Sequence, residues 1–94
     1  MRFGVRIDVS HLPGVLDPQG ATVERALPAL GFDNVSEVSI GKTIRLVVDA
    51  ADATAARAQV DEMCRRLLAN PVIERYVATV DELDQEQAQE TILS

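Results

Sequence analysis

The sequence predicts an α+β domain with a ferredoxin-like β-α-β-β-α-β order, a two-layer sandwich in which two helices cover one face of a four-stranded antiparallel sheet. Three observations lead to this fold class. Alternating apolar residues indicate strands, apolar residues at helical spacing indicate two helices, and capping or turn residues separate the segments. The 94 residues suffice for one such domain and are too few for two.

The first strand and the first helix are marked by local signals. Odd positions from Phe3 to Val9 are apolar, which is the period of a half-buried strand. Asp17 can cap a helix that has Pro18 at its first position, and Gly31 can close it in a left-handed conformation. Pro28 predicts a kink or a tightened last turn. The apolar stripe of this helix is Val23, Ala26, Leu27 and Leu30.

Two further alternating runs, at 37–40 and 43–48, flank Gly41–Lys42. Glycine adopts a positive φ without the penalty that a Cβ atom imposes. We therefore predict a β-hairpin whose turn is Gly41–Lys42.

The second helix has the longest regular apolar stripe in the chain. Asp52 or Thr54 can cap it, and Asn70 followed by Pro71 stops it, since proline forces the preceding residue out of the α region. The stripe consists of Ala56, Val60, Met63, Cys64, Leu67 and Leu68. A last strand is expected over 72–80.

With both helices on one face, the opposite face of the predicted sheet is bare. It carries apolar and long basic side chains: Arg2, Arg6, Arg45, Val47, Val77 and Thr79. A domain of this size buries roughly 60–65% of its unfolded-chain surface, so association is a natural supplement to its stability. We expect a homo-oligomer, a dimer or a tetramer, mediated by the sheet.

Charge separates a domain at residues 1–80 from an acidic tail at 81–94. The tail holds five of the fifteen acidic residues and no basic residue. The net charge of −6 argues against nucleic-acid or anionic-membrane partners, which require clustered Lys and Arg. The tail is either a solvated terminus or a segment that docks on a basic partner. No secretion signal or membrane-spanning apolar run is visible, so a cytoplasmic protein is expected.

Few residues could carry catalysis. Cys64, the single cysteine, lies on an apolar stripe, so we expect it to be a core residue. His11, the single histidine, lies beside a turn, so we expect it to anchor a loop. The aromatic residues Phe3, Phe32 and Tyr76 are too few for base stacking. Metal-ligand spacings and phosphate-binding glycine loops are missing too. We expect no catalytic residue, no metal and no cofactor.

Three separated blocks resemble a known family: Val15–Gly20 (VLDPQG), Gly41–Lys42 and Leu67–Glu74 (LLANPVIE). In this order, and within the predicted frame, residues 2–80 resemble the PurS family, the small subunit of phosphoribosylformylglycinamidine (FGAM) synthase. The acidic tail and Pro28 depart from the family's pattern.

The resemblance implies a non-catalytic subunit of the fourth step of purine (IMP) biosynthesis. In that family a large synthetase subunit performs the ATP-dependent amidination of formylglycinamide ribonucleotide, and a glutaminase subunit releases the ammonia. The small subunit, itself an oligomer, brings these two subunits together for ammonia transfer.

The family blocks also suggest which residues contact the partner subunits. The candidates are Leu16, Asp17, Gln19, Gly20, Lys42, Asn70, Pro71 and Glu74. Capping and terminating helices is an equally good explanation for Asp17, Gly20, Asn70 and Pro71, and Lys42 can be a solvated turn residue.

The segment Leu12–Leu16 also resembles the Pro-Gly turn of ACT domains, sensors of the same fold that bind amino acids at subunit interfaces. However, Leu12 occupies a position that is usually acidic in those domains, and Asp17–Pro18 delays the helix. A regulatory module that binds an amino acid is therefore the alternative.

Overall fold

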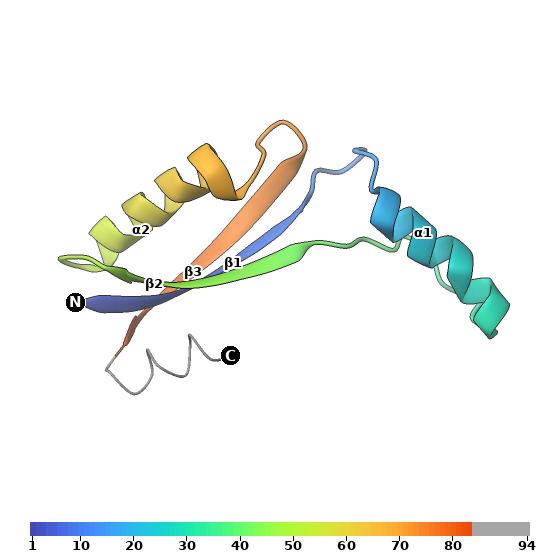
Figure 1. Ribbon diagram of the computed structural model, residues 1–94, viewed down its shortest axis with the longest axis horizontal. Helices are drawn as coiled ribbons and strands as arrows, with labels where there is room; N and C mark the ends of the chain where they lie inside the picture. Colours follow the sequence, from blue (N-terminus) through green and yellow to red (C-terminus); the bar gives the residue numbers. More distant parts are fainter. Residues whose placement is uncertain (84–94) are drawn as a thin grey trace.

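The computed structural model describes residues 1–83 as one sheet with a helix on one face and a second helix beyond its end (Figure 1). The segment 84–94 lies outside the described residues. In chain order the elements are β1 (Arg2–His11), α1 (Pro18–Ala26), the 3-10 helix η1 (Leu27–Leu30), β2 (Lys42–Asp49), α2 (Ala53–Met63), the π-turn η2 (Cys64–Leu68) and β3 (Glu74–Leu83). Strand β3 thus includes the first three residues of the predicted acidic tail.

The α+β class is confirmed, but within residues 1–83 the sheet has three strands and not the predicted four. Its order is β2-β1-β3, and the central strand β1 pairs antiparallel with both neighbours. Val5 lies opposite Leu46 on β2 and opposite Val80 on β3. The segment 37–40 forms no strand, so the predicted hairpin at Gly41–Lys42 is wrong.

The missing strand has a physical reason. The backbone N–H of Val38 donates to Glu24 Oε1 at 2.8 Å, and that of Ile40 donates to Asp17 Oδ2 at 2.9 Å. Glu37 has a positive φ of 59°, which interrupts an extended backbone. Side chains of the first helical segment thus accept two backbone hydrogen bonds in the stretch where a fourth strand was expected.

Helix α2 covers one face of the sheet and closes the core. Asp52, one of the two predicted caps, accepts a hydrogen bond from the Ala55 N–H at 2.8 Å. Cys64 is fully buried, as expected, and burial raises the pKa of its thiol. The buried core consists of Phe3, Val5, Ile7, Val9, Val48, Ala50, Ala56, Val60, Cys64 and Ala69.

Helix α1 does not cover the sheet, contrary to the prediction of two helices on one face. It projects beyond the end of the sheet together with η1 (Figure 1). The tightened last turn at Pro28 and the left-handed Gly31, with a φ of 96°, are confirmed. We call residues 17–41 the arm. Because of this projection the radius of gyration is 16.8 Å, against about 12 Å for a compact domain of this length.

Candidate partner-binding surface

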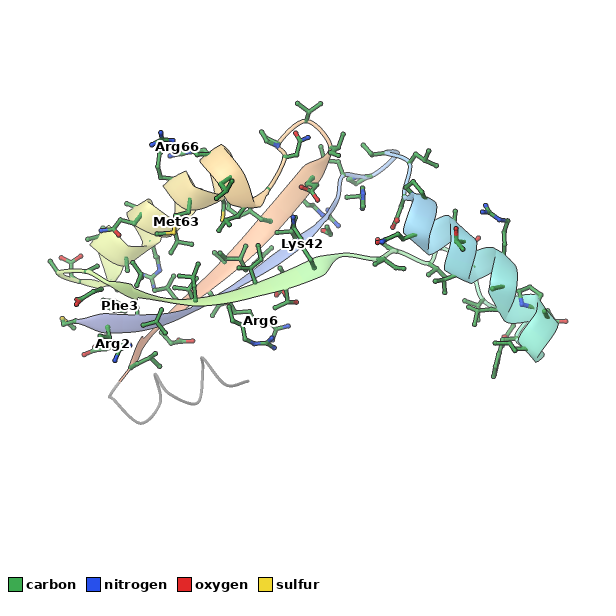
Figure 2. The ribbon with its side chains drawn as sticks, viewed as in Figure 1. Arg2, Phe3, Arg6, Lys42, Met63 and Arg66 are labelled. Carbon is green, nitrogen blue, oxygen red and sulfur yellow. The ribbon has the colours of Figure 1, made fainter. Side chains whose placement is uncertain are left out.

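The structure brings all three sequence blocks to the end of the sheet from which the arm projects. The Leu12 N–H donates to the Ile73 carbonyl oxygen at 2.9 Å and joins the loop after β1 to the loop before β3. Lys42, the first residue of β2, pairs with Val9 near the same end (Figure 2). We call this region, formed by residues 12–20, 67–74 and Lys42, the hinge end.

Asp17 holds together the start and the end of the arm at the hinge, where the arm meets the sheet. Its Oδ1 accepts from the Gly20 N–H and its Oδ2 from the Ile40 N–H, both at 2.9 Å. These backbone donors, Gly20 first, lower the pKa of the carboxyl group. His11 Nδ1, buried and without a hydrogen-bond partner among residues 1–83, lies 3.8 Å from Asp17 Oδ2. With its side chain only 13% exposed, Asp17 holds the hinge and offers little surface to a partner.

Gly20 also has a structural explanation. A Cβ atom there would lie 2.4 Å from the Val38 carbonyl oxygen, closer than any real contact of that kind. Any side chain at Gly20 would therefore push the segment 37–40 of the arm away from α1.

Asn70 and Glu74 hold the loop before β3. The Asn70 N–H donates to Glu74 Oε1 at 2.7 Å, and Asn70 Oδ1 accepts from the Val72 N–H at 3.1 Å. Sequence reasoning gave Glu74 no capping role, because its partner lies four residues upstream in a non-helical turn. A charge reversal at Glu74 would disturb this loop as well as any contact.

The exposed residues of the hinge end include three large apolar side chains. Leu16 is 76% exposed, Leu67 82% and Val72 78%. Among the predicted contact residues, Gln19, Lys42 and Pro71 are exposed as well.

Sequence reasoning placed Leu67 in the core. The π-turn η2 widens the last turn of the helix and rotates the residues after Cys64 relative to the regular apolar stripe. Leu67 consequently points outward, while Cys64 stays in the core.

An apolar groove of about 340 Å³ lies between β2 and the α2–η2 helix. Its walls are Leu46, Met63, Leu67 and Leu68, with Glu62 and Arg66 at the rim. Met63 lies between the helix and the sheet (Figure 2). The groove is on the helix-covered face of the sheet, next to α2, where the predicted fold would have put the first helix.

Within residues 1–83 no cluster of three or more His, Cys, Asp or Glu side chains could hold a metal ion. None of the helices in this part of the chain has the length and apolar character needed to cross a bilayer.

Comparison with known families decides the identity of this fold. The model of the PurS family, described as phosphoribosylformylglycinamidine (FGAM) synthase, matches residues 4–82. The chain belongs to the PurS family. The ACT-like resemblance is thus limited to the turn at Leu12–Leu16.

Individual PurS proteins are similar over most of their length. The PurS subunit of Synechocystis is 48% identical over 82 residues, which cover 87% of this chain and 82% of the relative. The solved PurS of Bacillus subtilis is 41% identical with a TM-score of 0.77, covering 85% of this chain and 99% of that one. A chain in the structure of PurLQS from Thermotoga maritima is 36% identical, also with a TM-score of 0.77, covering 85% and 98%.

Proposed function

We propose that this chain is the small, non-catalytic subunit of FGAM synthase and brings the glutaminase and synthetase subunits together for ammonia transfer in purine biosynthesis. The observation that carries the proposal is the PurS match over residues 4–82, supported by the similarity to a chain of PurLQS. We also propose that the chain is cytoplasmic, because it must be in the same compartment as the proposed synthetase and glutaminase subunits.

Ammonia transfer requires two active sites that stay together long enough to limit the loss of ammonia to solvent. A small scaffold that binds both subunits raises the effective concentration of one near the other and needs no catalytic residue. The small subunit would therefore contribute a binding surface for the two other subunits.

We place the partner contacts at the hinge end. Leu16 and Val72 are 76% and 78% exposed, and large apolar side chains that gather in one region are uncommon on a surface that has no partner. At the same end, Gln19 and Lys42 expose polar side chains and Pro71 exposes a rigid ring. Asp17, Gly20, Asn70 and Glu74 hold the backbone of this region in place.

Reconstitution tests the function. Purified synthetase and glutaminase of the same organism are assayed for glutamine-dependent FGAM synthesis with and without this chain, alongside an ammonia-driven control. Glutamine-driven activity should require the chain, while ammonia-driven activity should not. Equal glutamine-driven activity without the chain overturns the proposal.

A homo-oligomer is the second part of the proposal, and the arm suggests how it forms. Leu30 and Phe32 of the arm are 71% and 54% exposed, and the groove beside α2 is lined by apolar side chains. We propose that the arm of a second copy fills this groove. The exchange would complete the two-helix layer that one chain alone lacks.

A further inference from the structure

A single side-chain polar contact joins the arm to the sheet, although the chain passes between them twice. Helix α1 and η1 project away from the sheet instead of packing on it (Figure 1). Within residues 1–83, the contact of His11 with Asp17 is the only side-chain hydrogen bond or ion pair between a strand and the arm. The orientation of the arm relative to the sheet therefore depends on this contact and on the two connecting segments.

The two side chains meet below the surface. His11 is the last residue of β1, and its side chain is 24% exposed, against 13% for Asp17. Its Nδ1 is buried and has no hydrogen-bond partner within residues 1–83. That atom lies 3.8 Å from Asp17 Oδ2, the oxygen that accepts from the Ile40 N–H. Because a carboxylate oxygen accepts more than one donor, Asp17 can pair with the imidazole as well.

The strength of this contact depends on the charge of the imidazole. A neutral imidazole at this distance leaves the buried Nδ1 without a hydrogen bond, whereas an imidazolium forms an ion pair with the carboxylate. The backbone donors of Gly20 and Ile40 lower the pKa of the Asp17 carboxyl, which stays ionised well below neutral pH. Histidine side chains ordinarily change charge between pH 5 and 8. Across that range the ion pair is therefore controlled by His11 and not by Asp17.

The other charged residues at this end of the sheet have partners or positions of their own. Glu74 lies opposite His11 on β3 and accepts from a backbone N–H of its own loop. Arg75, the next residue, donates to Ser10 Oγ. Lys42 begins β2 and lies opposite the residue two positions before His11. Within the described part of the chain, Asp17 is the one carboxylate in ion-pair range of the imidazole.

We propose that His11 and Asp17 form a pH-dependent link between the sheet and the arm. When His11 is protonated, the ion pair fixes the arm in one orientation relative to the sheet. When His11 is neutral, the link is lost and the arm moves about its two connections, the loop 12–16 and the Gly41–Lys42 junction. The inference concerns contacts within one chain, so it does not depend on the role in FGAM synthase.

The composition of the chain makes this behaviour simple to detect. His11 is the only histidine in the sequence. An α-amino group also titrates in the range from pH 5 to 8, but the amino terminus pairs with Asp49 at the end of the sheet opposite the arm. A change in the order of the arm between pH 5.5 and pH 8 can thus be assigned by substituting one residue at each end of the sheet.

Residual dipolar couplings of the backbone amides in the full-length chain test the proposal. At pH 5.5 residues 17–41 should share the degree of order of the sheet. At pH 8 the order of the arm should fall, because the loss of an ion pair worth about 1 kcal/mol lowers the ratio of fixed to unfixed arm roughly fivefold. The measurement is repeated on Leu67→Asp, so that a second copy seated on the arm does not hide the change. An arm whose order is independent of pH in both proteins overturns the proposal.

Two variants make the result specific. His11→Gln carries no charge at either pH and should abolish the difference between pH 5.5 and pH 8. Asp49→Asn removes the partner of the amino terminus and should leave the difference intact. A difference that persists in His11→Gln, or one that disappears in Asp49→Asn, contradicts the assignment to His11 and overturns the proposal.

Discussion

Asp17 illustrates how one carboxylate can hold two parts of the chain. Each oxygen accepts a different backbone N–H, one from Gly20 within α1 and one from Ile40 at the end of the arm. Asp17→Asn keeps one acceptor oxygen for the Gly20 N–H but turns an uncharged NH2 group, itself a donor, toward the Ile40 N–H. The bond to Ile40 is therefore lost, and we expect a lower midpoint of urea unfolding. Asp52 is the matched control, since it caps α2 through one bond to Ala55. Asp52→Asn should change stability by only a few tenths of a kcal/mol, and equal losses at the two sites would contradict the hinge role.

The same residue predicts a dependence on pH. Its pKa lies below the ordinary value of 3.8, chiefly because the Gly20 and Ile40 N–H groups favour the charged form. A depressed pKa in the folded state adds stability that is complete above the unfolded pKa and is lost as pH falls through the folded one. The stability gap between wild type and Asp17→Asn should therefore narrow from pH 7 to pH 3. Urea midpoints at the two pH values check this, and a constant gap contradicts it.

At this scale the sequence predicted whatever depends on neighbours along the chain. The cap formed by Asp17, the tight turn at Pro28 and the buried Cys64 all follow from residues within one or two turns. The bond from Asp17 to Ile40 joins residues 23 positions apart, and no local pattern announces it. Glu74 was missed for the related reason that its partner lies in an irregular loop.

At the scale of elements, the end of the second helix gives a contrast between two apolar residues of one predicted stripe. Val60 is 1% exposed, whereas Leu67, beyond the π-turn, is 82% exposed. Val60→Ala should cost about 1.5–3 kcal/mol of unfolding free energy from lost burial and a small cavity. Leu67→Ala should stay within about 0.5 kcal/mol. Chemical denaturation of both variants measures this, and similar costs would mean that the helix continues regularly.

Three strands and both helices could be predicted because each has its own period and its own caps. The fourth strand could not, since the alternation at 37–40 fits equally a segment that runs along α1 and gives its N–H groups to Asp17 and Glu24. Likewise, the apolar stripe of α1 shows that this helix needs an apolar partner but not which chain provides it. The same holds for the candidate contact residues. The sequence identified the three blocks that contain them, but tertiary hydrogen bonds decide which of their side chains are exposed.

At the scale of the whole molecule, the arm exposes Leu30 and Phe32, and the groove exposes Leu67. The proposed arm exchange would bring these apolar surfaces together. Apolar burial is worth roughly 25 cal/mol per Å². In the proposed exchange, two copies related by a two-fold axis would each cover the groove of the other.

Three aspartate substitutions separate the groove from the sheet face opposite α2 as the site of self-association. Leu67→Asp puts a charge into the groove without disturbing the core, because this side chain is 82% exposed. It should shift the chain to monomer in sedimentation velocity, as should Leu30→Asp on the arm. Val77→Asp, at a 65% exposed position of the sheet face opposite α2, should leave the oligomer intact. If Val77→Asp alone dissociates the oligomer, association runs through the sheet face opposite α2, and the arm exchange is wrong.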